Sequence, residues 1–134
     1  MTFRARREFR NGIEMVENYD HGANASGHPG KLKQVILNLL INAIQAMDRP
    51  GKIEVGCSPA GVQRVKIWIE DQGLGMSEEV MAHLYEPFFT TKDKGTGLGL
   101  ATAYKIVEAH HGELRVTSHL GTGTRFEVYL SAAA

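Results

Sequence analysis

The sequence of 134 residues has little of what marks a secreted or membrane-spanning protein. Its single cysteine, Cys57, excludes an internal disulfide and suits a reducing compartment. The basic start, residues 1–7, is not followed by an apolar run, which argues against a signal peptide. No stretch approaches the ~20 apolar residues that a membrane helix needs. We therefore expect a cytoplasmic chain without membrane contact of its own, although its parent could be membrane-anchored.

The sequence also lacks a charge excess and several common catalytic motifs. Its 15 Lys and Arg residues balance 15 Asp and Glu residues, so no net charge favours nucleic acid as a partner. There is no His-Glu-x-x-His or Cys-x-x-Cys for zinc, and no Gly-x-Ser-x-Gly for acyl transfer. We interpret the pair His110-His111 as surface residues favoured by the end of a helix, not as metal ligands.

The apolar periodicity predicts one α+β domain, which is what a chain of this length can fill. Helical spacing predicts helices at 31–47 and 100–111, with a short helix after Ser77. Alternation predicts strands at 12–19, 52–58, 63–71, 113–119 and 124–130, with helices packed on one face of the sheet. Residues 1–11 are expected to be a frayed end or the tail of an upstream element, and residues 86–99 a functional loop.

Glycine is the unusual component, because many of the 15 residues are clustered. The clusters are Gly73 with Gly75, then Gly95, Gly97 and Gly99, then Gly121 with Gly123. Such clusters mark either ordinary turns or close approach of the backbone to a ligand. The second cluster runs into a helix, where backbone N–H groups form an anion site, although it is neither a P-loop nor a Rossmann fingerprint.

The segment before that cluster adds features that suit phosphate binding. Lys92 and Lys94 would attract a polyphosphate, and Phe88 and Phe89 are expected to pack against the domain as part of a lid. The alternative is a mobile surface loop, which explains the lysines but not the phenylalanines.

The first predicted helix carries a stripe of neutral amides beside its apolar face. The stripe contains Gln34, Asn38, Asn42 and Gln45, whose spacing places them on one side of the helix. Amide oxygens are suitable ligands for Mg²⁺, and amide NH₂ groups can donate to phosphate. The alternative is a solvated polar face.

A carboxylate ends the strand that precedes the first glycine cluster. Asp71 could accept a hydrogen bond, for example from an adenine amino group, while Gly73 and Gly75 let the backbone bend around a ligand. The alternative is an ordinary turn that begins with Asp.

Taken in order, these segments resemble the ATP-binding catalytic domain of two-component sensor histidine kinases, on the Bergerat-type fold shared with Hsp90, gyrase B and MutL. The amino-acid sequences of these motifs are similar to those of the nitrogen-regulation-like subgroup. The resemblance covers about residues 12–130 and implies a two-layer sandwich of about five mixed strands and three helices, in a domain at 12–131 followed by a tail at 132–134. The matching motifs are QVILNLLINAIQAM (34–47), DQGLG (71–75), EPFFTTK (86–92), GTGLGLA (95–101) and GTGT (121–124).

The resemblance implies the cofactors ATP and Mg²⁺ and a role for each motif. Asn42 would bind Mg²⁺, and Asn38 would assist at the metal or the phosphates. Asp71 would accept from adenine. The implied catalytic set is Asn38, Asn42 and Lys92. The implied nucleotide-binding residues are Asn38, Asn42, Gln45, Asp71, Gly73, Gly75, Met76, Thr90, Lys92, Gly95, Thr96, Gly97, Leu98, Gly99, Leu100 and Thr124.

Two further features bear on the reaction. The hydrolytic relatives usually carry Glu at the position of Asn38, and an amide cannot act as a general base, so water attack should be slow. No histidine of the chain is followed by an acidic residue and a proline, the context of the phosphoacceptor. We therefore expect a monomeric catalytic domain that phosphorylates a histidine on a separate dimerisation domain, which then serves a response regulator. The alternatives are a gyrase- or Hsp90-like ATPase and a nucleotide-gated binding module without catalysis.

Overall fold

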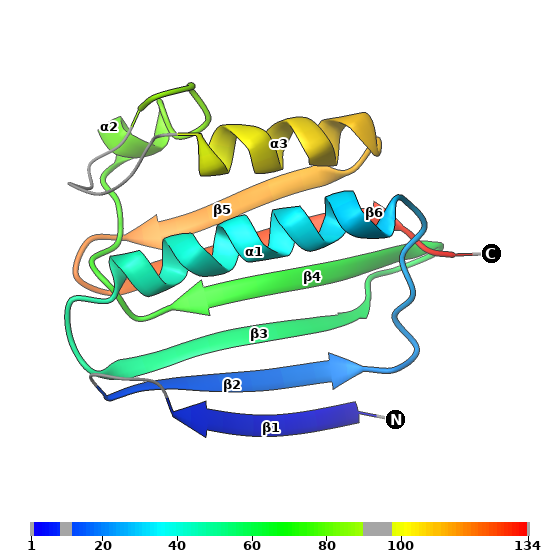
Figure 1. Ribbon diagram of the computed structural model, residues 1–134, viewed down its shortest axis with the longest axis horizontal. Helices are drawn as coiled ribbons and strands as arrows, with labels where there is room; N and C mark the ends of the chain where they lie inside the picture. The colour runs from blue at the N-terminus through cyan, green and yellow to red at the C-terminus, as the bar shows by residue number, and fades with distance from the viewer. Residues whose placement is uncertain (1, 9–11, 90–97, 134) are drawn as a thin grey trace.

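The computed structural model describes residues 2–8, 12–89 and 98–133, and in them a six-stranded sheet and three helices (Figure 1). The sheet order is β1-β2-β3-β4-β6-β5, with β2 and β3 parallel and the other neighbours antiparallel. The strands are β1 (Thr2–Glu8), β2 (Ile13–Asp20), β3 (Gly51–Pro59), β4 (Arg64–Asp71), β5 (Glu113–His119) and β6 (Gly123–Ser131). The helices are α1 (Pro29–Ala46), α2 (Glu78–Met81) and α3 (Gly99–Ala109).

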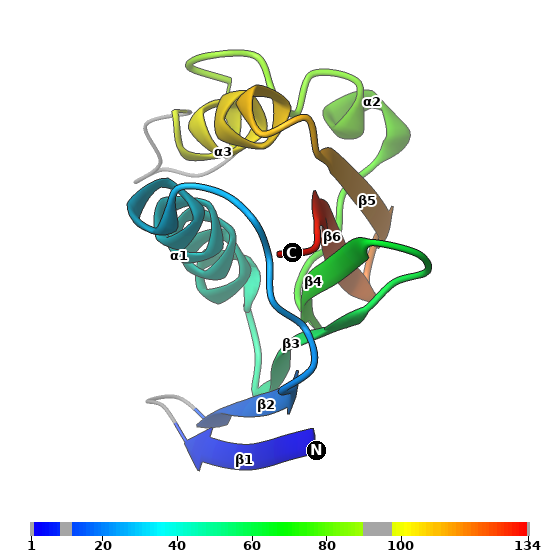
Figure 2. The ribbon, with the colours of Figure 1, turned by 90° about the vertical axis from the view of Figure 1, so that its right-hand side faces the viewer.

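The two long helices cover one side of the sheet, which confirms the predicted α+β sandwich. Figure 2 shows α1 and α3 side by side against the sheet, with α2 near β5. Alternate strand residues face these helices, because successive side chains of a strand point to opposite faces. The buried core lies between the layers and includes Val35, Leu39, Ala43, Ile53, Ile69, Val107, Phe126 and Val128.

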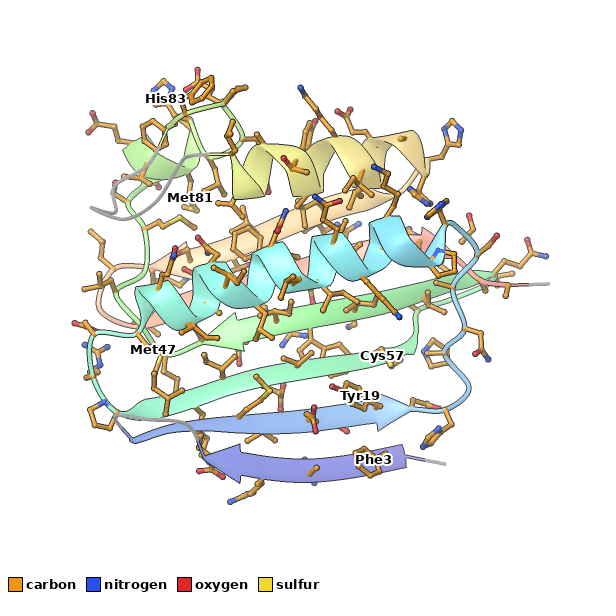
Figure 3. The ribbon with its side chains drawn as sticks, viewed as in Figure 1. Phe3, Tyr19, Met47, Cys57, Met81 and His83 are labelled. Carbon is orange, nitrogen blue, oxygen red and sulfur yellow. The ribbon has the colours of Figure 1, made fainter. Side chains whose placement is uncertain are left out.

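The predicted count of about five strands is wrong, because residues 2–8 form a sixth. This edge strand, β1, pairs with β2 from Thr2 opposite Asp20 to Glu8 opposite Glu14. Its Phe3 ring stacks on Tyr19 of β2, with the ring centroids 6.1 Å apart (Figure 3). A frayed end was expected because the stretch is dominated by arginine, but backbone pairing and one ring contact place it in the sheet. The domain start at residue 12 stays a prediction.

Two histidines join the start of α1 to the end of α3. The His28 ring accepts a hydrogen bond from the Lys31 N–H at 3.2 Å and so caps α1. His110 Nε2 accepts from the His28 N–H at 3.1 Å, while His110 Nδ1 lies 2.8 Å from the Ile106 carbonyl oxygen. His110 therefore links the two helices and is more than a surface residue. Among the described residues, no helix is both long and apolar enough to cross a bilayer.

Candidate functional site

Two predicted site residues, Asp71 and Thr124, lie at the same end of the neighbouring strands β4 and β6, beside Ser118 of β5. Asp71 is the last residue of β4, and Thr124 lies near the start of β6, directly opposite Ser118 of β5. All three side chains are buried, with exposed fractions of 4%, 4% and 6%. Because β4, β6 and β5 are adjacent in the sheet, strands far apart in the sequence bring these polar side chains together.

The Asp71 carboxylate is held by two backbone N–H groups. Its Oδ1 accepts from Gly73 at 2.9 Å and from Thr124 at 3.3 Å. Hydrogen bonds to the charged form fix the orientation of a carboxylate, and its two oxygens can accept further donors. The structure thus joins Asp71, Gly73 and Thr124 in one arrangement.

Three glycines stand where a side chain would collide with backbone. An added Cβ would meet the carbonyl oxygen of Ala46 at Gly73, of His119 at Gly75 and of Asp71 at Gly123. Gly75 and Gly123 also have positive φ values, 72° and 131°. Close packing of backbone segments therefore requires glycine at these positions, whereas the choice between ordinary turns and approach to a ligand stays a prediction.

Two residues that the sequence analysis did not select complete this end of the site. Ser118 Oγ accepts from the Met76 N–H at 2.8 Å and lies 2.8 Å from Thr124 Oγ1. Arg49 Nη2 donates to the Gly121 carbonyl oxygen at 2.7 Å and reaches that of Gly73 at 3.5 Å. Neither has a sequence signal, since Ser118 fits plain strand alternation and Arg49 belongs to a turn-like stretch.

The amide stripe of α1 spans the distance between this end and α3. Asn38 Nδ2 donates to the Gly99 carbonyl oxygen at 3.1 Å, and the Leu74 N–H donates to the Ala46 carbonyl oxygen at 3.0 Å. Asn42 lies on α1 one turn from each of these contacts and is half-buried. Gln34 and Gln45 are exposed, so the solvated-face alternative fits them but not Asn38.

The N-terminus of α3 presents backbone donors beside Asn38. Leu98 is the N-cap, and within the described part of the chain no side-chain hydrogen bond caps the helix there. No atom of the described residues lies within 4 Å of where a Cβ of Gly99 would stand, and Leu100 is half-buried. The first N–H groups of an 11-residue helix carry a partial positive charge, which suits an anion.

The phosphate-side predictions are only partly covered by the structure. Thr90, Lys92, Gly95, Thr96 and Gly97 lie outside the described residues, so their roles stay predictions. The expected packing of both phenylalanines is wrong for one of them. The Phe89 ring lies 5.6 Å from that of His83, which is labelled beyond α2 in Figure 3. Phe88 has a φ of 68° and is 74% exposed.

These features suit a nucleotide with its metal. A buried carboxylate and glycine-lined backbone can receive an amino-bearing base, while amide oxygens and a helix N-terminus suit Mg²⁺ and phosphate.

The sequence has many relatives among sensor kinases. The chain is 47% identical over 102 residues to "Sporulation kinase E" of Bacillus subtilis (strain 168), covering 76% of this chain and 14% of that protein. It is 46% identical over 102 residues to "Sensor histidine kinase ZraS" of Escherichia coli O157:H7, covering 76% of this chain and 22% of the relative. The chain thus spans less than a quarter of the length of these two relatives.

Solved structures share the fold. The mycobacterial sensor histidine kinase MprB matches with a TM-score of 0.76 and 27% identity, over 91% of this chain and 83% of that one. Full-length ShkA in complex with AMPPNP matches with a TM-score of 0.81 and 28% identity, over 92% of this chain and 27% of that one. The family model "Histidine kinase-, DNA gyrase B-, and HSP90-like ATPase" matches residues 27–134. The chain therefore belongs to the family of histidine kinase-, DNA gyrase B- and HSP90-like ATPases.

Proposed function

We propose that this chain binds Mg·ATP between α1, the 71–76 segment and α3, and presents the γ-phosphate to a histidine of another domain. The observation that carries the proposal is the Asp71 carboxylate, buried and oriented by the N–H groups of Gly73 and Thr124. A charged group held in this way is ready to accept from a ligand donor without reorganising. The similar structure of ShkA was solved in complex with the nucleotide analogue AMPPNP, which supports the choice of ATP as ligand.

The base would lie at the strand ends. Asp71 would accept from the adenine amino group, and Gly73, Gly75, Met76 and Thr124 would shape the surrounding pocket. The close packing of the glycines favours this role, because it fixes the pocket before the ligand arrives.

The phosphates would lie between the amide stripe and the N-terminus of α3. Asn42 would hold Mg²⁺, which supplies charge neutralisation on the phosphates when bound. Asn38, Gln45, Thr90, Lys92 and the Gly95–Leu100 segment would contact the metal or the phosphates. Asn38 has no basic group, so the chain would not activate water and would conserve the phosphoryl group for its acceptor.

The acceptor would be a histidine on a dimerisation domain of the same parent protein, and the phosphate would pass on to a response regulator. The names of the relatives, sensor histidine kinases and a sporulation kinase, support a protein-histidine kinase of which this chain is the catalytic domain. This domain would itself be monomeric and cytoplasmic.

Calorimetric titration of ATP, with and without Mg²⁺, tests the site. Asp71→Asn should weaken ATP binding at least about tenfold, because a hydrogen bond to a charged group is lost. Asp20→Asn is a matched control: Asp20 also ends a strand and accepts from the N–H two residues on, at 2.8 Å, but at the opposite end of the sheet. Asn42→Ala should remove the Mg²⁺ dependence, whereas Gln34→Ala on the same stripe should not.

A second assay separates the possible activities. With labelled ATP and a helical-hairpin phosphoacceptor domain, we expect label on the hairpin histidine and very slow phosphate release without it. Rapid release would instead indicate a hydrolytic ATPase. ATP binding without transfer to any matched hairpin would indicate a binding module, and absence of ATP binding would contradict the proposed site.

A further inference from the structure

One arginine in the connection between α1 and β3 contacts both backbone segments that surround Asp71. Arg49 Nη2 donates to the Gly121 carbonyl oxygen at 2.7 Å and reaches the Gly73 carbonyl oxygen at 3.5 Å. Gly73 belongs to the 71–76 segment and Gly121 to the β5–β6 turn. Figure 1 shows these two segments and the α1–β3 connection at the same end of the sheet. A single guanidinium nitrogen therefore bridges two segments that are far apart in the sequence.

The direction of both hydrogen bonds is fixed by the chemistry of the groups. A guanidinium nitrogen can only donate, and a carbonyl oxygen can only accept. Each terminal guanidinium nitrogen carries two hydrogens, which is enough for two carbonyl acceptors. The other terminal nitrogen of Arg49 lies 3.8 Å from Asp48 Oδ1, an ion pair within the same connection. The bridge between the two carbonyls thus needs no choice between donors.

Gly73 is the residue through which Arg49 acts on Asp71. The Gly73 N–H donates to Asp71 Oδ1 at 2.9 Å. The next peptide group is held on both of its sides, because its carbonyl accepts from Arg49 and its Leu74 N–H donates to the Ala46 carbonyl oxygen at 3.0 Å. With this peptide group fixed, the Gly73 N–H is also fixed against the carboxylate.

Gly121 is the second contact, and it belongs to the turn that leads to the other donor of Asp71. The Gly121 N–H donates to the Leu74 carbonyl oxygen at 2.8 Å, which joins the turn to the 71–76 segment. Beyond the turn, the Thr124 N–H donates to Asp71 Oδ1 at 3.3 Å. The two N–H groups that hold the carboxylate therefore belong to the two segments that Arg49 bridges.

We propose that Arg49 is a positioning residue for nucleotide binding: it holds the two segments together, so that the N–H groups of Gly73 and Thr124 stay aimed at Asp71. A carboxylate that is oriented in advance can accept from a ligand without further ordering. The Arg49 side chain is 47% exposed, so water can replace part of the bridge and the effect of its loss is moderate. The proposal rests on the nucleotide site proposed above.

Titrations of ATP and of adenosine against the whole chain test this role. Arg49→Ala should lower both affinities by a similar factor, about 3- to 10-fold, because the bridge between the two segments is lost. Adenosine carries no charge, so a cation that only attracted phosphates would affect ATP alone. Lys52→Ala is the matched control: it removes a nearby cation, keeps the backbone N–H that donates to Gln72 Oε1 at 2.9 Å, and should leave adenosine affinity unchanged.

Two results would overturn the proposal, with each variant shown to be folded by thermal unfolding. A loss of ATP affinity alone would mean that Arg49 acts through its charge. Unchanged affinities, whatever the effect on stability, would mean that Arg49 only supports the fold.

A second variant covers the case in which Arg49→Ala does not fold. Arg49→Met keeps an apolar stem and removes the donors, so it should lower both affinities by a similar factor. Unchanged affinities in Arg49→Met would overturn the proposal as well. Failure of the wild type to bind ATP or adenosine would instead contradict the proposed function, so the two failures are distinguishable.

Discussion

The site has two ends that are held in different ways. At the Asp71 end, comprising Asp71, Gly73, Gly75, Ser118, Gly123 and Thr124, backbone segments touch directly and exchange hydrogen bonds. At the Asn38 end, comprising Asn38, Asn42, Leu98 and Gly99, α1 reaches the start of α3 through the amide of Asn38. The first kind of contact tolerates little movement, while the second can form and break as a side chain turns.

This difference suits the division of labour that we propose. A base pocket gains affinity from being formed in advance, because no ordering is required when the ligand binds. A phosphate site that must admit ATP and then meet a second domain benefits from a reversible link between α1 and the start of α3. The far ends of the same helices are joined through His28 and His110, so movement of α3 would be greatest at the Asn38 end.

The largest expected effect comes from filling the Asp71 end. Gly75→Ala places a methyl group against the His119 carbonyl oxygen at a φ of 72°. We expect a loss of about 3 kcal/mol or more in the free energy of unfolding and loss of ATP binding, since backbone strain and collision add. Urea unfolding and titration of ATP measure both quantities.

Gly61→Ala is the matched control for that variant. Gly61 has a similar φ of 78°, but no atom in residues 2–8, 12–89 or 98–133 lies within 4 Å of an added Cβ. It should cost only about 1 kcal/mol, the strain of the left-handed conformation alone, and leave ATP binding unchanged. Equal losses in the two variants would show that packing at the Asp71 end contributes nothing.

A smaller effect is expected at the Asn38 end. Asn38→Ala removes the donor to the Gly99 carbonyl oxygen, so the free energy of unfolding should fall by about 1 kcal/mol. Amide exchange in the first turns of α3 should accelerate, while exchange at Gly73 and Thr124 stays slow. Hydrogen exchange followed by NMR measures each region separately.

Gln34→Ala provides the comparison for Asn38. Gln34 lies one turn earlier on the same stripe and is exposed, so its removal should change neither stability nor exchange. Accelerated exchange throughout the molecule in Asn38→Ala would contradict a local hinge.

The helices and strands can be predicted from the sequence better than the contacts between them. The periodicity of 31–47 and the alternation of 52–58 and 63–71 correspond to α1, β3 and β4 within a few residues, because each must bury one apolar face. The stretch that became β1 has few apolar residues, Phe3 and Ala5 among them, so its pairing with β2 left no such pattern. Backbone hydrogen bonds use groups that nearly every residue has, so a strand held mainly by them cannot be recognised from its sequence.

The same limit applies within the site. Asp71 and the glycines stood out because the glycines are clustered and the carboxylate directly precedes the first cluster. Ser118 and Arg49 did not, because their importance depends on partners at Thr124 and Gly121 that only the folded chain brings near. Gln45 shared the spacing of Asn38 and Asn42 but is exposed, since a stripe on a helix need not be covered along its whole length.

A third prediction concerns Tyr85, which packs against α3, the helix that begins at the Asn38 end. Tyr85, which follows α2, stacks on Tyr104 of α3 with ring centroids 4.6 Å apart, and its buried hydroxyl has no hydrogen-bond partner among the described residues. Burial, together with the neighbouring Tyr104, raises the pKa of Tyr85 from 10.0 to about 12. Tyr85→Phe keeps the ring and removes the unmatched hydroxyl.

We expect Tyr85→Phe to raise the free energy of unfolding by about 1 kcal/mol at neutral pH, because a buried polar group without a partner is unfavourable. Since the pKa of Tyr85 is higher in the folded chain, the unfolded chain loses this proton first as the pH rises from 10.0 to about 12. The wild type should therefore lose more stability over that range than Tyr85→Phe does. Urea unfolding at pH 7 and at high pH measures both effects. A destabilised Tyr85→Phe would mean that the hydroxyl is hydrogen-bonded when the chain is in solution, and the contrast between the Asp71 end and the Asn38 end would fail at this residue.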